Sequence, residues 1–249
     1  MEIRIFKTIQ ELQETMAVHF IATANNAISL RGECNVVLSG GNSPQSLYSM
    51  LASPDFTYAV SWDKINFFFG DERYVPATDS RNNARMVKEI LFDPLHISAS
   101  KIFSINTNLS PDEAANEYAD TIATHFKGGE VRFDLVLLGL GENAHTASLF
   151  PYSSVLNEQS ASIKAVLLKP QNEYRITMTA AMINQSRHIA FLVYGLAKAD
   201  AVHHVLEGEQ DVKKYPAQLI HSDYADLRWY LDEAAASGLS TDQCNRILQ

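Results

Sequence analysis

The amino-acid sequence predicts an α/β protein with an open, mostly parallel sheet and helices on both faces of that sheet. Short runs of β-branched, aromatic and aliphatic residues alternate with longer segments of helical periodicity, which is the pattern of repeated β-α-β units. The strand-like runs are also almost continuously apolar, as expected of strands that are buried on both faces. Together these observations indicate a parallel sheet with a helical layer on each side.

The positions of these runs give the expected elements. The first helix is expected at about residues 8 to 29, with Thr8 as its cap and apolar side chains at helical spacing. The four clearest strands are expected at Asn35 to Leu38, Ile65 to Phe69, Asp134 to Leu138 and His188 to Val193. Further helices are expected near residues 44 to 52, 82 to 92, 111 to 126, 196 to 207 and 224 to 237.

Composition limits the domain organisation and the classes of partner. The chain has 249 residues, of which 46% are hydrophobic and 20% are charged, so it can bury a full core. No linker, Pro-rich tract or repeat divides it, and we expect one domain over residues 1–249. The formal net charge of -9 argues against nucleic acid and anionic membranes as partners, but it allows a local basic site for a small anion.

The sequence carries no signal for membrane insertion or secretion. No apolar run approaches the roughly 20 residues of a membrane-spanning helix, and the first residues lack the pattern of a signal peptide. We therefore expect a cytoplasmic protein. Cys34 and Cys244 lie far apart and outside any metal-binding motif, so we expect neither a disulfide nor a thiolate metal site within the chain.

Each of the four expected strands is followed by a turn that contains glycine and polar residues. The turns begin at Ser39, Gly70, Gly139 and Tyr194. The carboxyl ends of parallel strands share one edge of an open sheet, and ligands bind at that edge. We therefore expect these four segments, although distant in the sequence, to line one pocket.

The turn after the first of these strands is a candidate anion site. Gly40 and Gly41 let the backbone approach a ligand closely. Ser43 is placed to cap the next helix, and Pro44 suits its first position. Free N–H groups and the helix dipole at such a position favour a phosphate. The alternative is an ordinary tight turn. A Walker loop is excluded, because no Gly-Lys-Ser/Thr sequence follows.

The second turn carries two acids and an arginine, Asp71, Glu72 and Arg73. The guanidinium of Arg73 can clamp a phosphate or a carboxylate through two hydrogen bonds, while an acid orients it. The alternative is a surface ion pair without a function. Lys198, shortly after the fourth turn, and Arg175 are further candidate cations, and the alternative for both is a solvated side chain.

His145 is the strongest candidate for a general base. Of the eight histidines, it alone follows a buried strand through a glycine-rich loop, where an imidazole can take a proton near neutral pH. The alternative is a structural histidine.

The loop before His145 also fits the G-x-G-x-x-A pattern of dinucleotide-binding sites. Such a site requires an acidic residue after the next strand, but the next strand-like run, Ile163 to Leu168, is followed by Lys169. The dinucleotide interpretation is therefore not favoured.

Several segments carry a resemblance to a known family. They are LSGGNSPQSLY, FFFGDERYVPATDSRNNARMVKEILF, FDLVLLGLGENAHTASLFP, RITMTAAMIN, FLVYGLAKADAVHHVLEG and the part from YPAQLI through LDEAAAS. In this order they resemble the 6-phosphogluconolactonase family, which is related to glucosamine-6-phosphate deaminases and ribose-5-phosphate isomerases. The resemblance implies a Rossmann-like fold of the sugar-phosphate isomerase and lactonase type. It also implies hydrolysis of 6-phospho-D-glucono-1,5-lactone to 6-phosphogluconate in the oxidative pentose phosphate pathway, without a metal or an organic cofactor.

The resemblance also implies roles for individual residues. His145 matches the family's catalytic histidine, Arg73 the arginine of its Asp-Glu-Arg motif, and Lys198 its lysine after the fourth strand. The other matching positions are Gly40, Gly41 and Ser43 in the phosphate-binding loop and Asn83 downstream of the valine-proline pair. The candidate supporting residues are Asp71, Asn143 and Arg175.

The sequence departs from the family pattern just before the histidine, where Asn143 and Ala144 replace the usual Asp-Gly. A neutral amide orients an imidazole without raising its basicity, and alanine tolerates a positive φ less readily than glycine. We therefore expect weaker activity or a lower pH optimum, unless Glu142 or Asp71 supplies the missing charge.

Two alternatives to the lactonase remain open. A glucosamine-6-phosphate deaminase or an aldose-ketose isomerase would use a carboxylate to move a proton between carbons, and Asp71 is available for this. A non-catalytic sensor of sugar phosphates is the other alternative. In each case the expected partner is a small phosphorylated sugar, and the protein is expected to be a monomer or a small homo-oligomer.

Overall fold

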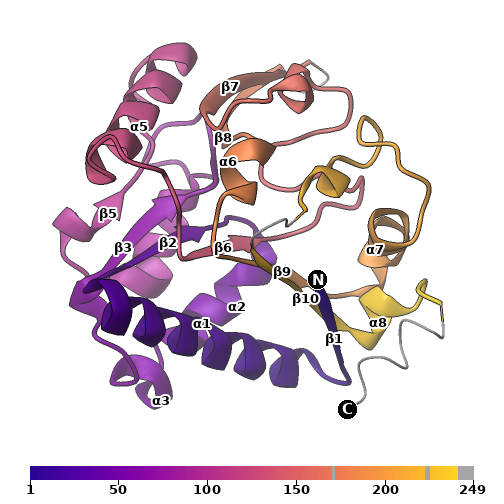
Figure 1. Ribbon diagram of the computed structural model, residues 1–249, viewed down its shortest axis with the longest axis horizontal. Coiled ribbons are helices and arrows are strands. Elements are labelled where there is room, and N and C mark those ends of the chain that lie inside the picture. Colours follow the sequence, from indigo (N-terminus) through magenta and orange to yellow (C-terminus); the bar gives the residue numbers. More distant parts are fainter. Residues whose placement is uncertain (170–171, 222–224, 241–249) are drawn as a thin grey trace.

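A seven-stranded parallel sheet forms the centre of the protein (Figure 1). The computed structural model describes residues 1–169, 172–221 and 225–240. The strand order is β1-β10-β9-β6-β2-β3-β5, and every neighbouring pair is parallel. The strands are β1 (Glu2–Phe6), β2 (Cys34–Leu38), β3 (Ile65–Phe69), β5 (Ile102–Phe103), β6 (Leu135–Leu138), β9 (His188–Val193) and β10 (Asp226–Asp232). The α/β class predicted from the sequence is confirmed.

A smaller antiparallel sheet, in the order β4-β8-β7, adjoins the main one. Its strands are β4 (Asp71–Arg73), β7 (Ile163–Leu168) and β8 (Glu173–Met178). Only Gly70 separates β3 from β4, so the chain passes directly from the edge of the main sheet into the small one. Arg73 and Arg175 are register partners in this sheet, which brings two candidate cations side by side.

Helices cover both faces of the main sheet, as Figure 1 shows. The face that bears α1 and α2 lies opposite the face that bears α5, α6 and the small sheet. The helices are α1 (Ile9–Arg31), α2 (Asn42–Leu51), α3 (Pro54–Thr57), α4 (Asn83–Val87), α5 (Pro111–His125), α6 (Ala180–Asn184), α7 (Ala199–Leu206) and α8 (Glu233–Ala236). A π-helical turn over Lys88–Phe92 extends α4.

Side chains of alternate residues in the central strands pack into two separate hydrophobic cores, one on each face of the sheet. In β3, Phe67 and Phe69 pack on the α1 and α2 side, whereas Phe68 packs on the α5 side. In β2, Val37 points to the same side as Phe68. Every residue of β2, β3 and β6 is buried. Burial on both faces explains why these runs are continuously apolar in the sequence.

The first helix begins as predicted and ends at Arg31. The Thr8 hydroxyl accepts a hydrogen bond from Glu11 N at 3.1 Å, and the Glu11 carboxylate accepts one from Thr8 N at 3.2 Å, which completes a capping box. Gly32 stops the helix with a left-handed φ of 84°. The four predicted strands agree with the structure to within one residue, whereas β1, β4, β5 and β8 were not predicted.

The helix predicted over residues 224 to 237 is wrong. Residue 224 lies outside the described residues, residues 226–232 form β10, and only the short α8 follows. Leucine, arginine and alanine favour a helix locally, but β10 gains backbone hydrogen bonds from β1 on one side and β9 on the other. This long-range pairing outweighs local propensity.

The structure also bears on the expectations about membrane-spanning helices and cysteines. Among the residues that the structure describes, no helix is both long and apolar enough to cross a membrane. Cys34 is buried without a disulfide partner in the described part of the chain, and Cys244 lies outside the described residues.

The capping box gives a prediction for stability. Thr8→Ala should lower the free energy of unfolding by about 1 kcal/mol, because the first turn of α1 loses its side-chain acceptor. The midpoint of thermal unfolding should then fall by roughly 2–4 °C. Thr8→Ser keeps the hydroxyl and serves as the matched control. A midpoint for Thr8→Ala equal to that of the unaltered protein would show that the cap contributes nothing.

Candidate active site

The carboxyl ends of β2, β3, β6 and β9 surround one cavity of about 370 Å³. All the candidate residues from the sequence line it except Asn143. The lining residues are Ser39, Gly40, Gly41, Asn42, Ser43, Pro44, Asp71, Arg73, Asn83, Gly139, Leu140, Gly141, His145, Thr146, Ala147, Ser148, Phe150, Arg175 and Lys198. The expectation that distant turns meet in one pocket is therefore confirmed.

The N-terminus of α2 opens into this cavity. Gly41 is the N-cap, with a left-handed φ of 92°, and no side chain caps the first turn. Asn42 and Ser43 line the cavity, and as first-turn residues they have N–H groups without an intrahelical partner. Ser43 lies inside the first turn and is not the cap that the sequence suggested, a shift of the kind common at helix ends. Such a terminus suits an anion.

Gly40 is needed because Asn83 occupies the space of a side chain. A Cβ at Gly40 would lie 1.8 Å from Asn83 Oδ1. Asn83 Nδ2 donates a hydrogen bond to the Asp71 carbonyl at 3.0 Å, while its buried Oδ1 has no hydrogen-bond partner in the described part of the chain. The loop after β2 and the start of α4 are thus packed directly against each other.

Glu72 is a buried structural anchor and not half of a surface ion pair. Its side chain is 1% exposed, and its carboxylate accepts hydrogen bonds from the backbone N–H groups of Arg73, Asn83 and Ala84 at 2.7 to 2.9 Å. Burial raises the pKa of Glu72 to about 7, against the opposing effect of these donors. The contacts fix the end of β4 to the start of α4, and they leave the guanidinium of Arg73 free for other partners.

Asp71 is also buried, and it lies on the cavity wall. The Ser148 hydroxyl donates a hydrogen bond to its carboxylate at 2.6 Å. Burial raises the pKa of Asp71, while Ser148, Arg73 and Arg175 act in the opposite direction. Within the described residues, Ser148 makes no hydrogen bond to His145, so a serine–histidine nucleophile pair is not formed.

The imidazole of His145 is held between Gly141 and Phe150. The rings of His145 and Phe150 stack at 4.1 Å between centroids, and a Cβ at Gly141 would lie 2.0 Å from Nδ1. Asn143 Oδ1 lies 2.5 Å from the same Nδ1. An amide oxygen can only accept, so we assign the proton to Nδ1 and the lone pair to Nε2.

The charge state of His145 is set by its surroundings. Burial lowers its pKa to about 4, and the nearby cations Lys198, Arg175 and Arg73 act in the same direction. The ring is therefore neutral near pH 7, which is the state that a general base requires.

The residues before the histidine show how the chain accommodates its departure from Asp-Gly. Ala144 adopts a left-handed φ of 59°, a conformation that costs alanine more than glycine. Its backbone is held at both ends, because its N–H donates to Gly141 O and its carbonyl accepts from Ala217 N, both at 2.9 Å. Glu142 and Asp71 make no hydrogen bond to His145 in the described residues, so neither replaces the missing aspartate in that contact.

Three cations reach the cavity, and they differ in how they are paired. Arg175 forms an ion pair with Glu173 at 3.1 Å. Arg73 donates a hydrogen bond from Nη1 to the Arg81 carbonyl at 2.7 Å, and Lys198 stands at the start of α7. Neither Arg73 nor Lys198 has an ion-pair partner among the residues that the structure describes. These two side chains therefore bring positive charge to the cavity that no ion-pair contact in the described residues neutralises.

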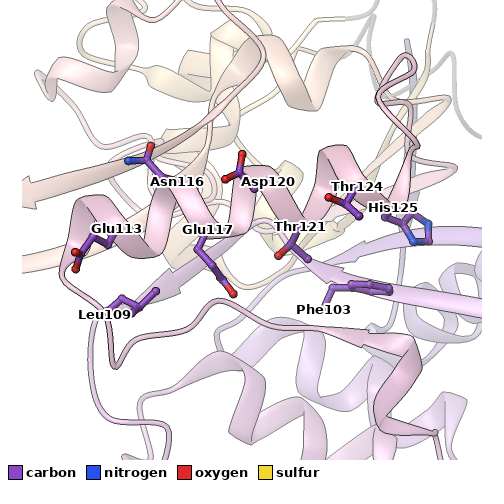
Figure 2. Close-up of a pocket in the computed structure, with 9 residues that line it drawn as sticks. All are labelled: Phe103, Leu109, Glu113, Asn116, Glu117, Asp120, Thr121, Thr124 and His125. Atoms are coloured by element: carbon purple, nitrogen blue, oxygen red, sulfur yellow. The ribbon is translucent and has the colours of Figure 1, made fainter.

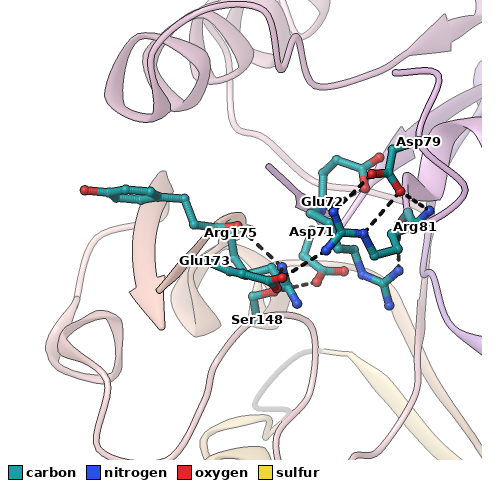
Figure 3. A network of polar contacts seen from close by, with 9 residues as sticks. Asp71, Glu72, Asp79, Arg81, Ser148, Glu173 and Arg175 are labelled. Atoms are coloured by element: carbon teal, nitrogen blue, oxygen red, sulfur yellow. Dashed lines mark hydrogen bonds and ion pairs between the residues drawn. The ribbon is translucent and has the colours of Figure 1, made fainter. Parts of the chain in front are cut away.

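A network of ion pairs lies at the side of the cavity next to Arg73 (Figure 3). Arg81 contacts Asp79 at 3.0 Å and Glu173 at 2.9 Å, and Glu173 in turn contacts Arg175. This network joins the loop after β4 to β8. The same Arg81 supplies the carbonyl that holds the Arg73 guanidinium.

Sequence reasoning missed several residues of the site. Phe150, which stacks on the His145 ring, was not among the candidates, and Ser148 was considered only as the nucleophile of a competing acyl-enzyme route, not as the partner of Asp71. Their nearness to His145 in the sequence was the available signal, but their direction depends on the loop conformation. Thr177 was missed as well; its hydroxyl accepts a hydrogen bond from Ser148 N at 3.2 Å, and no sequence pattern links the two.

A larger cavity of about 670 Å³ runs along α5, but its chemistry is different (Figure 2). Glu113, Glu117 and Asp120 lie along it, and neither lysine nor arginine is among its described lining residues. Such a groove repels anions. The smaller cavity at the strand ends is therefore the better site for a phosphorylated ligand.

Comparison with known proteins identifies the family. Residues 7–229 match the family model of glucosamine-6-phosphate isomerases/6-phosphogluconolactonase. A 6-phosphogluconolactonase of Synechocystis is 36% identical over 234 residues, covering 92% of this chain and 95% of that protein. Another from Haemophilus influenzae is 30% identical, covering 92% of this chain and 96% of that protein. The solved structure of 6-phosphogluconolactonase from Trypanosoma brucei has a TM-score of 0.81 at 26% identity, covering 96% of this chain and 98% of that one. The chain therefore belongs to the family of glucosamine-6-phosphate isomerases and 6-phosphogluconolactonases.

Proposed function

We propose that this protein hydrolyses 6-phospho-D-glucono-1,5-lactone to 6-phosphogluconate, with His145 as the general base. The observation that carries the proposal is a neutral imidazole in the same cavity as a free helix N-terminus and two unpaired cations. The names of the relatives from Synechocystis and Haemophilus influenzae support the choice of substrate. The reaction as proposed needs no cofactor.

The phosphate group binds at the cationic end of the cavity. Backbone N–H groups at the start of α2, the Ser43 hydroxyl, Lys198 and Arg73 contact its oxygens. This binding is remote from the carbon that reacts, so its free energy serves to hold the lactone in position for attack.

The chemistry takes place beside His145. Nε2 takes a proton from a water molecule, and the resulting hydroxide adds to the lactone carbonyl carbon. Backbone N–H groups of a glycine turn or the Arg73 guanidinium stabilise the oxyanion. The carbon–oxygen bond of the ring then breaks, and the imidazolium returns its proton to the departing ring oxygen. Asn143 keeps the proton on Nδ1, and with it the lone pair on Nε2.

An acyl-enzyme on Ser148 is the less favoured route. Its hydroxyl is fully buried and donates to Asp71, and the surrounding sequence is not a G-x-S-x-G elbow. The lactone is already an activated ester, so direct attack by water suffices.

The carboxylate of Asp71 on the cavity wall favours one second candidate. A glucosamine-6-phosphate deaminase or isomerase needs a carboxylate to move a proton between carbons, and the matching family model covers such enzymes. Ammonia release from glucosamine 6-phosphate by the purified protein separates the two activities. We expect none above the rate without protein.

His145→Ala should lower turnover of the lactone by on the order of 10²-fold or more, because the general base is lost. The lactone is generated enzymatically at mildly acidic pH, where it persists, and acid release is followed after subtraction of spontaneous hydrolysis. The matched control is His203→Ala, which removes a partly exposed histidine of α7 and should retain full turnover. Equal turnover in His145→Ala and the unaltered protein would remove His145 from the role of base.

Lys198→Ala should raise KM by roughly tenfold or more and leave kcat within a few-fold, because a charge-assisted contact to the phosphate is lost. Lys88→Ala, which removes an exposed lysine paired with Asp93, should change neither constant. Initial rates over a range of lactone concentrations measure both. An unchanged KM in Lys198→Ala would exclude this lysine from phosphate binding.

Asn143→Asp should move the acidic limb of the kcat/KM profile to higher pH by about one to two units. The unaltered enzyme keeps His145 neutral down to about pH 4, whereas a carboxylate at Nδ1 stabilises the imidazolium and raises the pKa of the ring. Below the new pKa the base is protonated and activity falls. Asn143→Ala, which adds no charge, is the control. Coincident acidic limbs in Asn143→Asp and Asn143→Ala would contradict the assigned contact.

A further inference from the structure

Two histidines and an aspartate meet at the amino ends of the strands, on the edge of the sheet opposite the cavity. His188 is the first residue of β9 and Asp226 is the first residue of β10, and the two are register partners. His19 reaches them from α1. One ligand atom from each residue lies within 4.8 Å of those from the other two.

One ring nitrogen in this cluster has no hydrogen bond in the described residues. His188 Nδ1 is buried and lies 3.4 Å from Asp226 Oδ2, yet it makes no hydrogen bond in the described residues. Asp226 Oδ2, the oxygen that faces His188, also pairs with Arg228 at 2.6 Å. An imidazole nitrogen without a hydrogen bond therefore lies beside a carboxylate oxygen that the guanidinium of Arg228 also contacts.

We propose that His19, His188 and Asp226 form a zinc-binding site, with water completing the coordination. Two imidazoles and one carboxylate are a ligand set that zinc prefers, with ligand distances of about 2.0 to 2.2 Å. Ligand atoms around a tetrahedral zinc ion then lie about 3.4 Å apart. The pair of His188 and Asp226 already has this spacing, and small side-chain rotations bring in His19.

The outer contacts suit metal binding by this set. The Tyr230 hydroxyl lies 2.8 Å from His19 Nδ1 and fixes the orientation of the ring, as outer partners of metal-binding histidines do.

Arg228 is the group that opposes the ion. It pairs with both Asp226 and Glu2, and its positive charge reduces the affinity for a dication. The same guanidinium holds the carboxylate in place, so the site is expected to be of moderate affinity. An ion here would join α1 to β9 and β10, far from the reacting groups. Its effect is therefore on stability and not on lactone hydrolysis.

The first test is equilibrium dialysis of the full chain against micromolar Zn²⁺ near pH 7.5. The unaltered protein should retain about one equivalent, and His188→Ala and Asp226→Asn should each weaken binding at least tenfold. His203→Ala is the matched control, because His203 has the Glu207 carboxylate at 3.5 Å but no third ligand among the residues that the structure describes. His145→Ala should also keep its zinc, which separates this site from the cavity. Mg²⁺ should not compete, since it prefers oxygen ligands.

A second measurement keeps the test informative if one variant folds poorly. Zn²⁺ should raise the midpoint of thermal unfolding of the unaltered protein by roughly 5 °C at about 100-fold excess over Kd. Arg228→Gln should tighten zinc binding by removing the opposing charge. Retention of no zinc by the unaltered protein, or equal retention by His188→Ala, would overturn the proposal. Either result is independent of the lactonase activity.

Discussion

Parallel pairing of β2, β3, β6 and β9 determines where the chemistry of this protein can occur. Neighbouring strands that run in the same direction must end at the same edge, so the turns that follow them meet there. The cavity is a consequence of this topology. The buried carboxylate of Glu72 then fixes the positions of Arg73 and Asn83 in the cavity wall. It does so by accepting hydrogen bonds from the backbone at the end of β4 and at the start of α4.

The positive charge of the cavity acts on both the phosphate and the general base. The chain carries a net charge of -9, yet Arg73, Arg175 and Lys198 gather at this one place. Their field attracts a phosphate, and it also helps to keep His145 unprotonated. A base with so low a pKa is weak, but a bound phosphate dianion partly neutralises the cations. The pKa of His145 then rises, so the base is stronger when substrate is present.

The sequence was sufficient for those features that depend on local pattern or on parallel topology. Periodicity located α1 and the central strands, and the glycine turns pointed to Gly40, Gly41, Ser43, Arg73, His145 and Lys198, whereas Asn83 came from the family resemblance. Features set by distant partners could not be found this way. β10 is a strand because β1 and β9 lie beside it, and Ser148 matters because Asp71 faces it. The resemblance to the family, which the comparisons confirm, supplied the substrate that the residues alone left open.

One cavity is proposed to hold the phosphate at the α2 terminus and the reacting carbon at His145. A crystal structure of the protein with bound 6-phosphogluconate would show whether it does. We expect phosphate oxygens within hydrogen-bond distance of the Ser43 N–H and Lys198, and the product carboxylate beside His145 Nε2. A product bound in the reverse orientation, or bound in the other cavity along α5, would contradict this arrangement.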